Sequence, residues 1–151
     1  MALKFGSKAP DFKLKGSSGG FINFYSDVKS TCILYFYPKD FTPGCTIEAC
    51  QFRDDFDDFK KLDIPVFGIS KDSVETHIKF SRKLNLPFQL LSDPRGRVIR
   101  EYKAMLPFIN LPRRITYLVS SEKIILAAFE NMFRAPEHIK EMMAAVDKAV
   151  K

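Results

Sequence analysis

The sequence predicts an α/β fold in which a mixed sheet is covered by helices on both faces. Two observations support this prediction. Apolar, β-rich runs alternate with segments of helical periodicity, and the last two β-rich runs are separated by only four polar residues. The chain has 151 residues and 46% hydrophobic content, enough to bury a substantial core, so we expect a single domain over residues 1–151.

An N-terminal β-hairpin is the first expected element. Residues 12–15 and 21–25 alternate apolar and polar side chains, and the intervening segment 16–20 (GSSGG) is typical of a flexible turn. The run at residues 32–37 (CILYFY) is continuously apolar. Such a run indicates a strand buried on both faces, so we place it centrally in the sheet.

Two further apolar runs resemble this central strand. They lie at residues 64–70 and 88–91, and the segment between them, residues 72–84, has the features of a helix. Asp72 followed by Glu75 fits a capping box at its start. Strands that alternate with helices in this way imply a mixed sheet covered on both faces.

The end of the chain predicts an antiparallel pair of strands and a closing helix. Residues 115–119 and 124–129 form the pair, separated by a short polar connection. Pro136 is well placed to open a helix. Apolar residues then recur at spacings of three and four, as in an amphipathic helix; they are Ile139, Met142, Met143, Val146 and Val150.

The segment after the central strand carries two of the three cysteines. It begins with the turn Thr42-Pro43-Gly44, and one side of the expected helix then has a regular apolar stripe. The stripe consists of Cys45, Ala49, Phe52, Phe56 and Phe59. Cys45 therefore lies in the first helical turn and faces the core. Unpaired backbone N–H groups and the positive end of the helix dipole stabilise a thiolate there, which makes Cys45 a candidate nucleophile.

The second cysteine of this segment, Cys50, faces another direction. A separation of five residues rotates it by about 140° around the helix axis and places the two Cα atoms roughly 8.6 Å apart. An undistorted disulfide requires less than about 7 Å. Cys45 and Cys50 can therefore bond only if the first turns of the helix unwind, which suits a redox cycle better than a permanent crosslink.

Other chemistry finds less support in the sequence. Cys32 lies within the apolar strand, where a cysteine is typically a small, inert hydrophobic residue. His77 and His138 fall in different predicted helices, where we expect surface or partly packed positions. Without Cys-x-x-Cys spacing we do not expect a metal site.

Composition also bounds the partners. The net charge of +6 comes from scattered lysines and arginines without a basic run, so we expect a solvated surface and no nucleic-acid binding. No apolar stretch approaches the roughly 20 residues that span a bilayer, and residues 1–12 lack signal-peptide features. We therefore expect a soluble protein that is not exported and lies in the cytoplasm, with an organelle as the alternative compartment.

A resemblance to a known family starts at the cysteine segment. The pattern Pro38-x-x-x-Thr42-x-x-Cys45 resembles the active-site signature of the peroxiredoxins. Residues 35–50 together resemble the bacterioferritin comigratory protein, or peroxiredoxin Q, branch of that family. The similarity continues at residues 6–12, 52–54, 68–80, 86–88 and 90–93.

The resemblance weakens beyond residue 103. The family has an arginine just before a Thr-Phe strand start, and Arg114-Ile115-Thr116-Tyr117 follows that pattern loosely. Arg113 is the adjacent alternative for the same role, and we favour Arg114. Lys103 stands where the family often has glycine.

The resemblance implies a thioredoxin-like fold and a thiol-dependent peroxidase. Cys45 would be the peroxidatic thiolate, which attacks a peroxide oxygen and becomes a sulfenic acid. Thr42 and the backbone N–H of Cys45 would hold the peroxide, and Arg114 would stabilise the thiolate and the transition state. Pro38 would shield the pocket from water, and Glu48 would orient the arginine.

The resemblance also implies how the cycle closes. Cys50 would resolve the sulfenic acid as an intrachain disulfide, and thioredoxin or a similar dithiol would reduce it. Neither a metal nor another cofactor is required, and a monomer suffices because both cysteines lie in one chain. Hydrogen peroxide and organic hydroperoxides both remain as substrates. A thiol-disulfide oxidoreductase and a redox-sensing switch remain as alternative functions.

Overall fold

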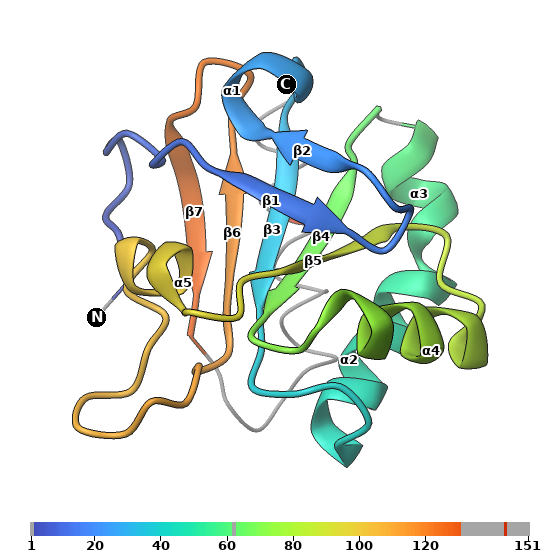
Figure 1. Ribbon diagram of the computed structural model, residues 1–151. Coiled ribbons are helices and arrows are strands. Elements are labelled where there is room, and N and C mark those ends of the chain that lie inside the picture. The colour runs from blue at the N-terminus through green and yellow to red at the C-terminus, as the bar shows by residue number, and fades with distance from the viewer. Residues whose placement is uncertain (1, 62, 131–143, 145–151) are drawn as a thin grey trace.

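The computed structural model describes residues 2–61, 63–130 and 144 (Figure 1). These residues contain a seven-stranded mixed sheet with the order β2-β1-β5-β4-β3-β6-β7. β3, β4 and β5 are parallel to one another, and the other neighbouring strands pair antiparallel. The strands are β1 Lys13–Gly16, β2 Phe21–Asn23, β3 Cys32–Phe36, β4 Val66–Ser70, β5 Gln89–Ser92, β6 Ile115–Val119 and β7 Ile125–Phe129.

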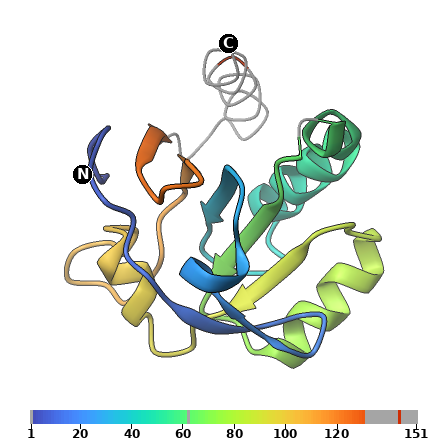
Figure 2. The same cartoon turned by 90° about the horizontal axis from the view of Figure 1, so that it is seen from above.

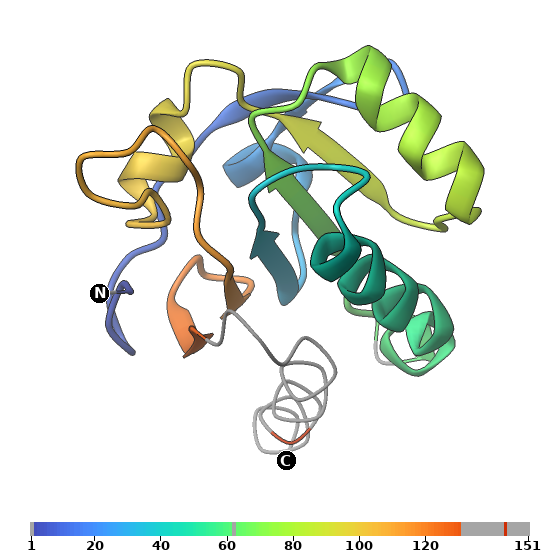
Figure 3. The same cartoon turned by 90° about the horizontal axis from the view of Figure 1, so that it is seen from below.

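Helices cover both faces of the sheet, as Figures 2 and 3 show. They are α1 Phe24–Asp27, α2 Pro43–Asp54, α3 Phe56–Lys61, α4 Val74–Leu84 and α5 Arg97–Glu101. α2, α3 and α4 lie on one face, and α1 and α5 lie on the other. Both crossovers, β3 to β4 and β4 to β5, step in the same direction along the sheet. Right-handed connections therefore place their helices on the same face.

The alternation of side chains along β3 divides the core into two layers. Tyr35 belongs to the layer beneath α2, where its ring stacks on Phe52 with centroids 4.6 Å apart. Leu34 and Phe36 point the other way, toward the layer beneath α1 and α5. All five residues of β3 are buried, as the continuous apolar run predicts. The α/β class with its mixed sheet and N-terminal hairpin is confirmed.

The predicted helix over Cys45 to Phe59 is wrong in its length. α2 ends at Asp54 and α3 starts at Phe56, so the apolar stripe continues across a break. Asp55 lies at the break with a non-helical backbone (φ −94°, ψ 4°). Its carboxylate accepts a hydrogen bond of 2.9 Å from the Gln51 side chain. A pair at i and i+4 is compatible with a helix, so the backbone leaves the helix only at Asp55 itself. The apolar stripe, which continues at Phe56, gives no sign of this break.

The predicted cap of α4 is also wrong. Ser73, and not Asp72, is the N-cap, and its hydroxyl accepts a hydrogen bond of 3.2 Å from the backbone N–H of Thr76. The Asp72 carboxylate instead accepts bonds from the backbone N–H of Asp40 and from the Ser70 hydroxyl, at 2.9 and 2.6 Å. A tertiary partner thus displaces the local capping role.

Several other details lie outside the predictions. α1 and α5 have four and five residues, too few for a periodic pattern to reveal them. Lys103, which stands where the resembling family often has glycine, has φ +57°, a left-handed conformation that costs energy for a residue with a Cβ atom. The amphipathic helix predicted from Pro136 lies outside the described residues. Among the described helices, none has the length and apolarity to cross a membrane.

Candidate active site

The candidate site lies where the carboxyl end of β3 meets the start of β6. In the antiparallel register Phe36 pairs with Ile115, which places Arg114 beside the chain that leaves β3. That chain turns through Pro38 to Thr42 into the first turn of α2. The carboxyl edge of parallel strands is the usual location of sites in open α/β sheets, because the loops there converge.

Cys45 and Arg114 meet in this corner. Their side chains are buried, with relative exposures of 2% and 5%, and Arg114 Nη2 donates to Cys45 Sγ at 3.4 Å. Gly44 permits the close approach, since a Cβ atom there would lie 3.0 Å from Arg114 Nη2. The arginine cation and the N-terminal end of α2 both favour a negative charge on the sulfur.

Glu48 holds the guanidinium from the next turn of α2. Arg114 Nη1 donates to Glu48 Oε1 at 2.5 Å, and the glutamate is fully buried. Its other oxygen, Oε2, has no hydrogen-bond partner among the described residues. Burial raises the pKa of Glu48 to about 7, although the Arg114 cation acts in the opposite direction. Glu48 in turn raises the pKa of Arg114, which keeps the guanidinium charged.

Arg113 faces a different environment. Its Nη2 atom pairs with Glu130 at 2.8 Å on the outer side of the sheet edge, where the glutamate side chain is 44% exposed. Successive residues of an extended chain point to opposite sides, so only one of the two arginines can reach Cys45. The contact with the sulfur belongs to Arg114, the residue favoured from the sequence.

Thr42 and Pro38 border the same corner. Thr42 is the N-cap residue of α2 (φ −91°, ψ 151°), but its hydroxyl donates to the backbone carbonyl of Lys39 at 2.8 Å and makes no cap bond. Pro38 is half-buried and contributes to an open pocket of about 310 Å³. That pocket is also lined by Lys39, Lys71, Asp72, Asn110, Leu111 and Pro112.

The three cysteines are free thiols in different surroundings. Cys50 is half-buried on α2, and Cys45 is buried in the first turn of the same helix. Cys32 is fully buried in β3, and desolvation raises the pKa of its thiol to about 12. With α2 intact, Cys45 and Cys50 are separate, as the helix geometry predicts.

Comparison with known proteins identifies the family of this chain. A model of the AhpC/TSA family matches residues 5–128. Over 150 residues the chain is 39% identical to peroxiredoxin Bcp of Bacillus subtilis, covering 95% of this chain and 94% of that protein. The chain belongs to the peroxiredoxins. It is also 40% identical over 139 residues to chloroplastic peroxiredoxin Q of Sedum lineare, covering 91% of this chain and 75% of the longer plant protein.

A solved structure agrees with this assignment. The bacterioferritin comigratory protein of Xanthomonas campestris superposes with a TM-score of 0.88 at 28% identity, and the match covers 100% of both chains. The predicted family, thioredoxin-like fold and reaction class, a thiol-dependent peroxidase, are confirmed.

A second polar cluster of this peroxiredoxin was missed by the sequence analysis. We expected His77 at the surface or partly packed, without ligand-like neighbours, and this is wrong because His77 is fully buried. The ligand atoms of His77, Asp40 and Asp72 lie within 4.8 Å of one another. Hydrogen bonds within the protein already engage these atoms. The available signal was that Asp40 and Asp72 each follow a predicted strand, so both reach the same edge of the sheet.

Proposed function

We propose that this peroxiredoxin reduces hydrogen peroxide and organic hydroperoxides through Cys45. The observation that carries the proposal is the buried contact of 3.4 Å between Arg114 Nη2 and Cys45 Sγ at the N-terminal end of α2. The thiolate attacks one peroxide oxygen and the O–O bond breaks. Water or an alcohol leaves with a proton, and the sulfur becomes a sulfenic acid.

The other residues of the corner have distinct roles in this step. The backbone N–H of Cys45 and the Arg114 guanidinium stabilise the charge that develops on the two oxygens. The Thr42 hydroxyl donates to Lys39, so its lone pairs can accept the peroxide proton. Glu48 fixes the orientation of Arg114 through the 2.5 Å bond, and Pro38 limits access of water.

Cys50 resolves the oxidised site. Its thiol attacks the sulfur of the sulfenic acid and the oxygen leaves as water, which forms a Cys45–Cys50 disulfide. α2 has to open at its first turns because the two residues lie on different sides of the helix. A dithiol, thioredoxin or a similar protein, then attacks the disulfide and returns both thiols at the cost of its own oxidation. The cycle needs no cofactor and no metal, since the dithiol supplies both electrons.

The proposal also covers the substrates and the state of the protein. The Xanthomonas structure is described in connection with alkyl peroxide reduction, which favours organic hydroperoxides as substrates here too.

We also propose that residues 1–151 form one domain that acts as a monomer in the cytoplasm. The match to the Bacillus relative over 94% of its length supports the single domain, and the presence of Cys45 and Cys50 in one chain supports the monomer. The Sedum relative is chloroplastic. Sedimentation of the reduced and oxidised protein tests the monomer.

Cysteine variants test the proposed cycle. In stopped-flow consumption of hydrogen peroxide, we expect Cys45→Ser to abolish the reaction and Cys50→Ser to complete one oxidation and then stall. Cys32→Ser is the matched control and should turn over as the parent does with thioredoxin and its reductase. Mass mapping of the oxidised protein should find the Cys45–Cys50 disulfide.

The same experiment separates the alternatives. A disulfide that contains Cys32, or peroxide consumption by Cys45→Ser, would refute the assignment. A single stoichiometric oxidation that no dithiol reverses would favour a redox-sensing switch. Efficient disulfide exchange without peroxide consumption would favour a thiol-disulfide oxidoreductase.

A further inference from the structure

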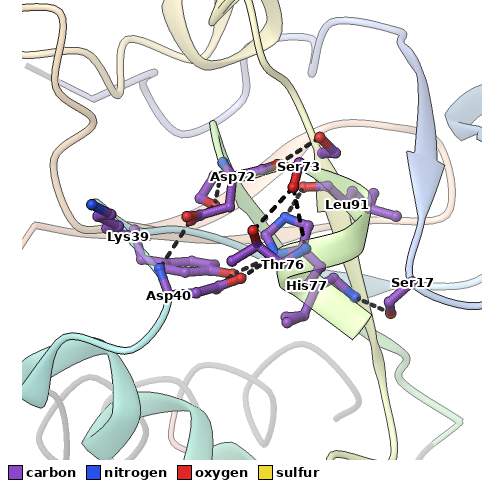
Figure 4. Close-up of polar contacts among 12 residues, drawn as sticks. Ser17, Lys39, Asp40, Asp72, Ser73, Thr76, His77 and Leu91 are labelled. Carbon is purple, nitrogen blue, oxygen red and sulfur yellow. Dashed lines mark hydrogen bonds and ion pairs between the residues drawn. The ribbon is translucent and has the colours of Figure 1, made fainter. Parts of the chain in front are cut away.

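The loop between β3 and α2 is attached to a buried polar group of side chains that we call the Asp40 cluster. The cluster consists of Tyr37, Asp40, Ser70, Asp72 and His77. Figure 4 shows Asp40, Asp72 and His77 pointing toward one another from the loop, from the β4–α4 turn and from α4. None of the cluster's members belongs to the cysteine corner described above.

Asp40 has partners on three sides. Its Oδ1 atom accepts a bond of 2.5 Å from the Tyr37 hydroxyl, and its Oδ2 atom lies 2.6 Å from His77 Nδ1. Its backbone N–H donates to Asp72 Oδ2 at 2.9 Å. The Asp40 side chain is buried, so losing any of these partners would leave a desolvated polar group unpaired. The loop is therefore fixed at this residue.

His77 connects Asp40 to the sheet. The imidazole is fully buried, and its Nε2 atom lies 3.0 Å from the backbone carbonyl of Leu91 on β5 (Figure 4). A carbonyl only accepts, so Nε2 carries the hydrogen, and Nδ1 and Asp40 Oδ2 share a proton. Both ring nitrogens thereby have partners, and the histidine connects the loop to the interior strand β5. We call this connection from Asp40 through His77 to Leu91 the tie.

The residue after Asp40 shows that the loop needs such a tie. Phe41 has φ +65°, a left-handed backbone that is uncommon for a bulky side chain and persists only where the surroundings impose it. Its ring contacts Phe80 of α4, with centroids 5.0 Å apart. Thr42 follows directly as the N-cap of α2. The backbone held by Asp40 thus sets where the Thr42 hydroxyl and the first turn of α2 lie.

We propose that His77 is a positioning residue of the peroxidase. Through Asp40 it holds the loop, Thr42 and the first turn of α2 in the arrangement that reacts with peroxide. This inference rests on the proposed roles of Cys45 and Cys50. It adds a consequence that those roles do not contain, namely that the same tie opposes the opening of α2 that Cys50 needs.

The tie therefore acts in opposite directions on the two halves of the cycle. A weaker tie misplaces Thr42 and slows oxidation, but it lowers the cost of opening and speeds disulfide formation. It also shortens the time for which the Cys45 sulfenic acid is exposed to a second peroxide. That side reaction transfers another oxygen to the sulfur and gives a sulfinic acid plus water or alcohol.

Two substitutions at one position isolate the bond to Asp40. His77→Asn places an amide near the Nδ1 position and keeps a partner for Asp40, whereas His77→Gln places it near Nε2 and keeps only the bond to Leu91. Ser73→Ala is the matched control, because it removes the cap of the same helix without touching Asp40. Circular dichroism verifies the fold of each variant. Tyr37→Phe, which removes one bond to Asp40, replaces His77→Gln if that variant does not fold.

The readouts are the oxidation rate, the disulfide formation rate, the sulfinic fraction at Cys45 and hydrogen exchange of residues 38–50. For His77→Gln we expect oxidation to slow about tenfold, less than the roughly hundredfold that a 1 Å misplacement of a reacting group can cost. We also expect faster disulfide formation, less sulfinic acid and faster exchange. His77→Asn should lie nearer the parent, and Ser73→Ala should match it in all four. If the parent and both His77 variants oxidise equally fast, or Ser73→Ala matches His77→Gln, the inference is wrong. The proposed cycle, which the cysteine variants test separately, would then still stand.

Discussion

Cys32 and Cys45 are buried to almost the same degree, with relative exposures of 0% and 2%, yet their surroundings predict opposite chemistry. Cys32 is the first residue of β3 and lies among apolar side chains, where desolvation raises the pKa of its thiol to about 12. Cys45 lies at a helix start with the Arg114 guanidinium 3.4 Å from its sulfur. Burial alone therefore does not decide reactivity.

The two thiols differ in the groups that replace the water each of them loses on burial. At Cys45, an arginine and the N–H groups of a helix end take the place of solvent as partners for a negative sulfur. At Cys32, desolvation raises the pKa of the thiol, and this effect is larger than the opposing effect of Lys123. A buried cysteine becomes a nucleophile when its partners are preorganised for the thiolate.

Removing the guanidinium should have the largest effect on this contrast. We expect Arg114→Ala to slow oxidation of Cys45 by about a hundredfold, in the range found when one preorganised donor is lost. Stopped-flow peroxide consumption measures the rate. Arg113→Ala is the matched control and should oxidise at the parental rate, since Arg113 pairs with Glu130. Equal rates for the two variants would remove Arg114 from the mechanism.

Glu48→Gln should have a smaller, pH-dependent effect on stability. Burial raises the pKa of Glu48 from 4.5 to about 7, so between these values the folded state keeps a proton that the unfolded state releases. The parent should thus lose stability relative to Glu48→Gln as the pH rises from about 4.5 to 7, by up to about 3 kcal/mol. Urea unfolding at several pH values, in a Cys45→Ser background that removes the neighbouring thiol, measures the difference. A difference that stays constant with pH would contradict the assigned shift.

The smallest effect should come from Cys32. In the reduced native protein, iodoacetamide should modify Cys45 and Cys50 but leave Cys32 unmodified until the protein is unfolded, because only the thiolate reacts. Cys32→Ala should retain the parental turnover and cost about 1 kcal/mol of unfolding free energy through the lost packing. Mass spectrometry after timed labelling measures the first expectation. Early modification of Cys32 would remove the contrast between the two buried thiols.

Local patterns predicted much of this architecture. The apolar run at residues 32–37 located the central strand, and the stripe beginning at Cys45 located the helix that carries the thiols. Both patterns reflect which neighbouring residues are buried, so they can be recognised within a short stretch of sequence. The break at Asp55 was not predictable in this way, because the apolar stripe continues through it at Phe56.

By itself the sequence determined the sheet, the placement of Cys45 in a first helical turn and the separation of Cys50 from it, because helix and strand periodicities act over a few residues. Only the tertiary structure decided which arginine reaches the sulfur and how His77 is buried against Asp40. The first contact joins residues that are 69 positions apart in the sequence, and the second joins residues that are 37 positions apart. They depend on strand register and helix packing, which bring together groups that no local pattern connects.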